Sequence, residues 1–300
     1  MLWVITFIGG KILKKSILAK SMAITMVLAL LTLSLFAQNT SSGNIKLIGA
    51  YPVEAKIEAG YTLKIPMLEG EGPLFNGNNL KVKSLLGLSP VGASLGFDAV
   101  LTPIAVMELT VGGTLGTGWD FDPMGISGVL VSSTGNIGTD LTGDPFGGVY
   151  VKGRAGAALQ FDTGVIFPGD WTSILLRTYH EFMYQGYTGA DEKQAWEFEN
   201  QGAKVNGFNY KGEYLIGYKL PIKINMVALQ LETFSNNLFG DVDHPFKYDI
   251  GLIGNVEFFD GLNLTVIVQG TNMEKDETSK KITTVDFGFK RVGVVLNYSL

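Results

Sequence analysis

The sequence predicts an all-β protein: a transmembrane antiparallel up-and-down β-barrel of about ten strands, within limits of about 8 and 12, preceded by an N-terminal signal helix. Three observations support this fold class. Apolar and polar residues alternate over long stretches, no apolar run of helix length follows the first 36 residues, and glycine and aromatic residues are abundant. With 39 Gly, 18 Phe and 11 Tyr among 300 residues, the composition favours strands and turns over helices.

The clearest alternation runs from Val53 to Met67, where every odd position is apolar and the even positions are polar, Gly or Pro. A period of two predicts a strand. Strands of soluble proteins usually have about 5 or 6 residues, whereas a tilted membrane strand needs about 9 to 11. The same pattern returns in segments 93–101, 107–115, 149–161, 208–220, 248–258 and 262–268.

One segment changes its phase. From Leu80 to Leu88 the apolar residues occupy even positions, and after Ser89-Pro90 they occupy odd ones. A β-bulge at the proline would produce such a shift. We therefore interpret 80–101 as one bent strand.

The N-terminus has the pattern of a secretory signal. Four lysines between positions 11 and 20 precede an apolar segment, Met22 to Phe36, which ends at Ala37-Gln38. The alternative is an uncleaved inner-membrane anchor. We expect a signal peptide at 1–37, a periplasmic N-terminal segment at 38–52 and the transmembrane barrel at 53–300. Cleavage removes four of 23 basic residues and none of 28 acidic ones, so the mature chain is acidic and we expect no nucleic-acid partner.

The predicted connections are of two kinds. Short turns are expected at 102–105, 168–171, 221–223 and 260–261, and long polar loops at 68–79, 118–148, 188–205, 235–246 and 272–281. Bacterial outer-membrane barrels have short periplasmic turns and long external loops. This alternation predicts a location in the bacterial outer membrane, with membrane lipids as partners.

The alternation also predicts which charged side chains point into the barrel. The candidate interior charge network is Lys152, Arg154, Arg177, Glu181, Asp98, Glu108, Asp162, Glu213, Asp249 and Glu257. A narrow barrel is largely filled by its own side chains, so these charges either form a structural set of ion pairs or line a narrow polar pore. His180, in contrast, has the phase of the lipid-facing side.

The last residues alternate up to the carboxyl end. The apolar positions are Val292, Val294, Leu296, Tyr298 and Leu300. This segment resembles the C-terminal assembly signal of bacterial outer-membrane proteins, with Leu300 in place of a terminal aromatic residue. The resemblance implies the outer-membrane barrel-assembly machinery as a partner.

Four segments resemble uncharacterised outer-membrane barrels of treponeme-type spirochaetes. They are Leu101-Thr102-Pro103-Ile104-Ala105, Pro145-Phe146-Gly147-Gly148, Phe167-Pro168-Gly169-Asp170-Trp171 and Arg177-Thr178-Tyr179-His180-Glu181. The resemblance implies the fold and the location, and no activity.

No feature predicts catalysis or a cofactor. Omptins are ten-stranded outer-membrane proteases with Asp and His at the outer rim, and Asp241, Asp243 and His244 lie in a predicted outer loop. No matching second acidic pair accompanies them. Without cysteine there is no disulfide, no thiolate metal site and no lipid-modified Cys.

We therefore expect a non-enzymatic integral outer-membrane protein with a structural or narrow-pore, small-solute permeation role. The alternative is an adhesin-like surface protein that binds a ligand through outer loops 118–148 and 188–205. The oligomeric state stays open.

Overall fold

The computed structural model describes residues 39–300 except 53, 134–139, 242–245 and 276–281. The described residues fall almost entirely in one compact unit, Ser41–Leu300. The predicted signal peptide at 1–37 lies outside the described residues.

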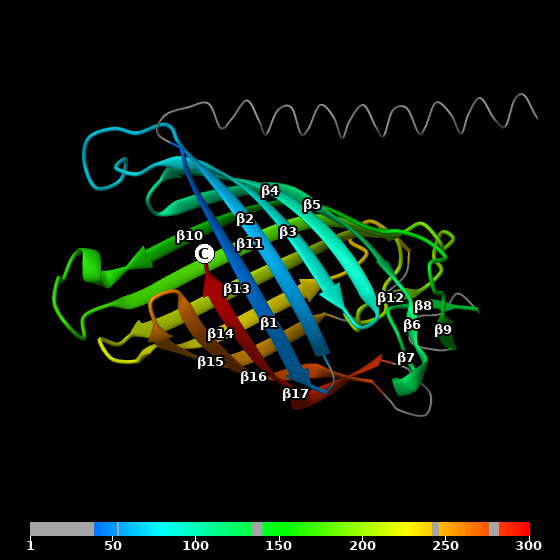
Figure 1. Ribbon diagram of the computed structural model, residues 1–300. Helices are drawn as coiled ribbons and strands as arrows, with labels where there is room; N and C mark the ends of the chain where they lie inside the picture. Colours follow the sequence, from blue (N-terminus) through cyan, green and yellow to red (C-terminus); the bar gives the residue numbers. More distant parts are fainter. Residues whose placement is uncertain (1–38, 53, 134–139, 242–245, 276–281) are drawn as a thin grey trace, which may run out of the picture. The chain divides into compact units, whose positions relative to one another are not determined.

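Twelve strands form a closed antiparallel barrel (Figure 1). Around the barrel the order is β1-β17-β16-β15-β14-β13-β11-β10-β5-β4-β3-β2, and β1 and β17 pair to close it. The strands are β1 (Thr40–Tyr51), β2 (Glu54–Pro66), β3 (Asn79–Ser89), β4 (Gly92–Ile104), β5 (Met107–Gly118), β10 (Tyr150–Asp162), β11 (Ile174–Tyr187), β13 (Gly207–Lys219), β14 (Ile224–Ser235), β15 (Lys247–Phe259), β16 (Leu262–Lys275) and β17 (Ile282–Ser299).

The other elements are short. A three-stranded sheet contains β12 (Trp196–Phe198), β8 (Val129–Ser132) and β9 (Leu141–Gly143), and β6 (Asp120–Phe121) pairs with β7 (Ile126–Ser127). Two 3₁₀ turns, η1 (Asp122–Met124) and η2 (Thr163–Val165), complete the described chain. No helix among the described residues is long and apolar enough to span a lipid bilayer.

The predicted count of about ten strands is wrong, and one missing strand is β1. It occupies most of segment 38–52, so the predicted boundary at residue 53 is wrong as well. Ile45, Leu47 and Tyr51 are exposed on its outer side, an alternation that the polar residues at the start of the strand obscured. The barrel therefore begins at Thr40.

The second missing strand arises at Pro90, because segment 80–101 is not one bent strand. Ser89 pairs with Gly92 across a two-residue turn, and Leu88 pairs with Ala93. Such a hairpin pairs an even position with an odd one, so the outward face changes parity at the turn. The phase change at Ser89-Pro90 thus marks a reversal of the chain and no bulge.

This hairpin also moves one loop to the other end of the barrel. The long outer loop predicted at 68–79 corresponds to residues 67–78 of the structure, and these lie beside the short turn between β4 and β5. The Ala105 N–H donates to the Leu74 carbonyl over 2.8 Å, and the Asn78 side-chain amide donates to the Pro103 carbonyl over 2.6 Å. We call this end the short-turn end, and the end that carries β6 to β9 and β12 the loop end (Figure 1).

The barrel strands present apolar side chains outward and most of their charges inward. Val111 on β5, Leu229 on β14 and Leu252 on β15 are exposed on the outer face, and Leu252 is 62% exposed. Adjacent strand positions turn to opposite faces, which places Glu181, Glu232 and Asp249 inside, all buried. The wall is thus apolar where it faces outward and charged where it faces its own lumen.

Candidate functional site

The centre of the interior is a cluster around Glu181 of β11, whose exposed fraction is 2%. Lys152 Nζ lies 2.6 Å from Glu181 Oε1, and Arg154 Nη1 lies 3.5 Å from Glu181 Oε2. The Tyr179 hydroxyl donates to Glu181 Oε2 over 2.6 Å. Because β10 and β11 are paired neighbours, strand alternation turns all four side chains into the lumen together.

A glycine allows this cluster to reach a third strand. Arg154 on β10 and Asp98 on β4 are both register partners of Gly112 on the intervening strand β5. A Cβ atom at Gly112 would lie 2.0 Å from Asp98 Oδ1. With glycine there, Arg154 binds Asp98 across β5 through two bonds, Nε to Oδ1 at 2.9 Å and Nη2 to Oδ2 at 2.5 Å.

Further ion pairs extend around the wall from Glu108 on β5. Lys81 of β3 lies 3.1 Å from Glu108, and Arg177 of β11 lies 4.0 Å from Glu108 and 3.3 Å from Glu213. Lys211 on β13 then joins Glu213 at 3.5 Å to Glu232 at 2.5 Å.

The contacts continue around the wall to β2. The Gln269 amide donates to Glu232 over 3.0 Å, and Arg291 donates to Gln269 over 2.6 Å and to Glu54 of β2 over 3.2 Å. The series thus runs from β3 around the wall to β2, where Glu54 lies ten positions before Lys64, the register partner of Lys81. We call it the charged belt; its members are Lys81, Glu108, Arg177, Glu213, Lys211, Glu232, Gln269, Arg291 and Glu54.

Three predicted residues lie outside these groups. Asp162 pairs with Lys219 at 2.6 Å at the short-turn end. Asp249 is fully buried and lies 2.6 Å from Lys290 Nζ, and Glu257 accepts a hydrogen bond from Asn225 over 3.3 Å. The structure thus brings together Lys152, Arg154, Glu181 and Asp98 in one cluster and Glu108, Arg177 and Glu213 in the belt.

The sequence analysis missed Lys290 and Arg291, which are consecutive and yet both contact interior groups. The register between β16 and β17 shifts here: Gln269 pairs with Arg291 and Gly270 with Phe289, which leaves Lys290 as an extra residue. Such a bulge re-aims a side chain. The signal was present, because the outward apolar residues change from odd positions (Phe287, Phe289) to even ones (Val294, Tyr298).

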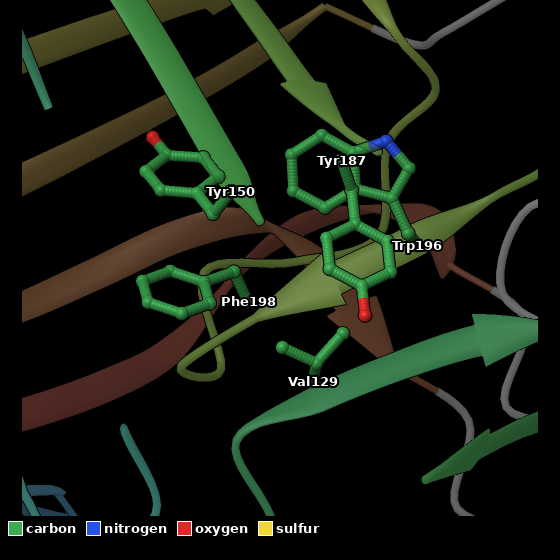
Figure 2. Close-up of a cluster of buried hydrophobic side chains, with 5 residues drawn as sticks. All are labelled: Val129, Tyr150, Tyr187, Trp196 and Phe198. Atoms are coloured by element: carbon green, nitrogen blue, oxygen red, sulfur yellow. The ribbon is translucent and has the colours of Figure 1, made fainter. Parts of the chain in front are cut away.

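A second feature that the sequence analysis missed closes the loop end. Val129, Tyr150, Tyr187, Trp196 and Phe198 form a buried apolar cluster (Figure 2). The rings of Tyr150 and Phe198 stack with centroids 4.6 Å apart, and the ring of Trp196 lies 6.2 Å from that of Tyr187. Tyr150 and Tyr187 are opposed on barrel strands β10 and β11, so the loop strands β8 and β12 pack directly against the barrel wall.

We call the described parts of 119–149 and 188–206 the cap. Beyond the apolar cluster, Glu199 accepts hydrogen bonds from Lys56 of β2 over 3.0 Å and from Ser89 of β3 over 2.7 Å. Glu199 follows β12, in the connection between β11 and β13, and the barrel order places β10, β5, β4 and β3 between β11 and β2. The cap therefore crosses the mouth and is held on the far wall.

One buried cap lysine has no carboxylate within 4 Å among the described residues. Lys204 forms a bridge with Trp196, and its Nζ lies 5.7 Å from the centre of the Trp196 ring. Burial lowers the pKa of Lys204 to about 8. The nearby positive charge of Lys247 also lowers this pKa, whereas the negative charge of Glu197 raises it. Burial disfavours the charged form of an amine, so Lys204 loses its proton at a lower pH than an exposed lysine does.

The residues considered for catalysis do not form a described site. Asp241 lies 2.8 Å from Lys193 in an exposed ion pair, and Asp243 and His244 lie outside the described residues. His180 lies on the outer face, where its Nδ1 is 2.5 Å from the Tyr210 hydroxyl. Among the residues that the structure describes, no group of three or more His, Asp or Glu could hold a metal ion.

The predicted assembly segment forms the closing seam. Val292, Val294, Leu296 and Tyr298 of β17 pair with Tyr51, Gly49, Leu47 and Ile45 of β1, and the Leu300 N–H donates to the Gly43 carbonyl over 2.8 Å. Recognition of this segment by assembly machinery stays a prediction.

Comparisons with known proteins find similarity only at the level of structure. No family model and no curated protein sequence matches the chain. The KdgM porin, solved in complex with disordered oligogalacturonate, has 10% sequence identity. The match covers 87% of this chain and 99% of the porin chain, with a TM-score of 0.39. The NanC porin has 6% sequence identity. The match covers 86% of this chain and 100% of the porin chain, with a TM-score of 0.42.

OmpT, an outer membrane protein of Vibrio cholerae, has 10% sequence identity. The match covers 89% of this chain and 99% of the OmpT chain, with a TM-score of 0.36. All three TM-scores lie below 0.5. The barrel assignment accordingly rests on the strand order and pairing of the chain itself.

Proposed function

We infer that the protein is an integral membrane barrel of the bacterial outer membrane, with a narrow pore for small solutes. The observation that carries this proposal is the division of the wall into an apolar outer face and a charged inner face. A closed barrel satisfies its backbone hydrogen bonds within the sheet, and lipid can then cover the apolar face. The resemblance to spirochaete barrels belongs to the same proposal.

The pore must be narrow. Eight strands enclose little more than their own side chains, and porins of 16 to 18 strands leave an aqueous channel. Twelve strands fall between these limits. The side chains of the charged belt project from the wall into the lumen and narrow it, and the cap covers the mouth at the loop end.

Single-channel recording with purified, refolded protein in planar bilayers tests this proposal. The wild type should give small, intermittent currents, because the belt and the cap both obstruct the lumen. Arg154→Ala removes the cation that Asp98 and Glu181 share and leaves the lumen with one positive charge fewer, so the current should rise and shift toward cations. The matched control Arg154→Lys keeps the charge and should shift selectivity less.

Two outcomes would contradict the proposal. Steady currents as large as those of a general porin would mean that the belt and the cap do not obstruct the lumen. Complete absence of current from the wild type and from Arg154→Ala would leave only a structural role.

A second candidate function is ligand binding at the outer surface. Trp119, Asp120, Asp122, Pro145 and Phe146 line an open hollow of about 510 Å³ in loop 119–149. The Trp119 and Phe146 rings stack 5.6 Å apart, and Phe146 is 68% exposed with a left-handed φ of 56°. Aromatic walls with a few polar groups are typical of ligand sites. Glycan-array binding that Trp119→Ala abolishes would support this candidate, and an array without binding would exclude carbohydrate there.

A further inference from the structure

Four lysines point into the lumen from three adjacent strands on the side of the short-turn end. Lys46 is on β1, Lys64 on β2, and Lys81 and Lys83 are on β3. Their neighbours Ile45, Leu47 and Tyr61 are exposed on the outer face, so strand alternation turns the lysines inward. Lys64 and Lys81 are direct register partners on paired strands.

Three of these lysines lack the ion pairs that the rest of the lumen has. Lys81 binds Glu108 at 3.1 Å, but no carboxylate of the described residues lies within 4 Å of Lys46, Lys64 or Lys83. Every other inward Lys or Arg among the described strand side chains has such a partner. Among the described barrel strands, the inward cations without an ion pair therefore all lie on β1 to β3.

The strand register shows why Lys83 has no carboxylate partner. Lys83 is the register partner of Asp98, which would ordinarily make a cross-strand ion pair. Arg154 reaches over Gly112 and takes both oxygens of Asp98 instead. Glu108, the other acid near Lys83, is shared between Lys81 and Arg177.

Like charges directly opposite each other on paired strands are destabilising. Lys64 faces Lys81 in this way. The positive charges of Lys46 and Lys81 both repel the positive charge of Lys83. A multivalent anion between these ammonium groups would convert the repulsion into attraction. Each ammonium brings three donors, as phosphate or carboxylate oxygens require.

We propose that Lys46, Lys64 and Lys83, with Lys81 beside them, form an anion-binding site on the β1–β3 wall of the lumen. Its ligands are small solutes that carry phosphate or more than one carboxylate. The proposal deepens the pore function inferred above and rests on it for transport, although binding itself does not require conduction. Solutes that cross the lumen would meet this wall near the short-turn end.

Isothermal titration calorimetry of the refolded protein with inorganic phosphate, at constant ionic strength, tests binding directly. The double variant Lys64→Gln/Lys83→Gln should weaken phosphate binding by about tenfold or more, equivalent to about 1.4 kcal/mol. The control Lys193→Gln/Lys223→Gln removes the same charge from exposed positions outside the lumen and should bind as the wild type does. A thermal melt of each variant checks that it is folded.

Reversal potentials in a salt gradient test the same site during conduction. The wild type should prefer chloride to potassium and lose chloride current when phosphate is added, and Lys64→Gln/Lys83→Gln should lose both properties. Equal phosphate binding by the wild type and the double variant, or no binding by either, would overturn the site. Binding without any current would support the site and count against the pore, so the two proposals fail separately.

Discussion

The two ends of the lumen are built by different interactions. At the loop end, Trp196, Phe198 and Val129 fill the mouth with apolar side chains against Tyr150 and Tyr187. At the short-turn end, the wall of β1 to β3 carries lysines without carboxylate partners. Packing is short-range and indifferent to charge, whereas unpaired charge acts over a Debye length of about 10 Å at 0.1 M salt.

The comparison indicates a division of roles. The cap decides whether a solute can enter at the loop end, because packed side chains exclude all solutes alike. The proposed anion site on the lysine wall would decide which sign of charge is retained, because lysines attract anions and repel cations. Changes at the loop end should therefore alter how much current passes, and changes at the short-turn end should alter its selectivity.

The largest effect is expected for Trp196→Ala. Loss of a fully buried Trp leaves a cavity and should destabilise the cap by about 3 to 5 kcal/mol. Hydrogen exchange in β8 and β12 should become fast and channel current should rise, while ion selectivity stays unchanged. Trp171→Ala, at an exposed position of the short-turn end, is the matched control and should change neither. A cap that still protects its amides after Trp196→Ala would contradict the packing model.

A smaller effect is expected for Glu199→Gln, which weakens the attachment of the cap to the far wall. The carboxylate bonds to Lys56 and Ser89, and loss of its charge should cost about 1 to 2 kcal/mol. We expect faster proteolysis within 188–206 and more frequent channel opening. Glu192→Gln removes an exposed carboxylate from the same loop and serves as control. Identical cleavage rates for the two variants would show that Glu199 does not hold the cap.

A third effect is a pH dependence at Lys204. Its pKa of about 8 in the folded cap lies below the ordinary value of 10.5. Below pH 8 both folded and unfolded caps bind the proton, and between pH 8 and 10.5 only the unfolded cap retains it. Cap stability should therefore rise with pH in this window, by at most about 1.4 kcal/mol per unit.

Hydrogen exchange in β12 between pH 7.5 and 10, corrected for intrinsic rates, measures this rise. The exposed Lys193→Met should keep the rise and Lys204→Met should abolish it. A flat profile in the wild type would mean that Lys204 is not desolvated in solution.

The sequence predicted the barrel class well because strand alternation is a local property. The errors occurred where one local pattern allows two structures. The parity change at Ser89-Pro90 fits a bulge as well as a hairpin, and only pairing of Leu88 with Ala93 distinguishes them. The prediction places segment 38–52 outside the barrel because polar residues obscure the alternation at the start of β1, and the partner strand β17 lies at the far end of the chain.

For the interior, alternation predicts which side chains point into the lumen but not which of them form ion pairs with each other. Arg154 and Asp98 were both expected inside, yet their bond depends on Gly112 of a third strand. The cap was not predicted at all. Its strands have 2 to 4 residues, too short for a periodic pattern, and Trp196 and Phe198 become buried only through contact with β10 and β11.

The seam between β1 and β17 has a consequence for how the barrel folds. Asn44 and Asn297 bond across it although 253 positions separate them, and Arg291 meets Glu54 across 237. Closure of so long a loop is entropically slow, so neighbouring hairpins should form first and the seam last. Until then β1 and β17 present unpaired edges that can recruit other chains. The Arg291 to Glu54 contact forms only in the finished cylinder, and a spectroscopic label at that pair would report the final folding step.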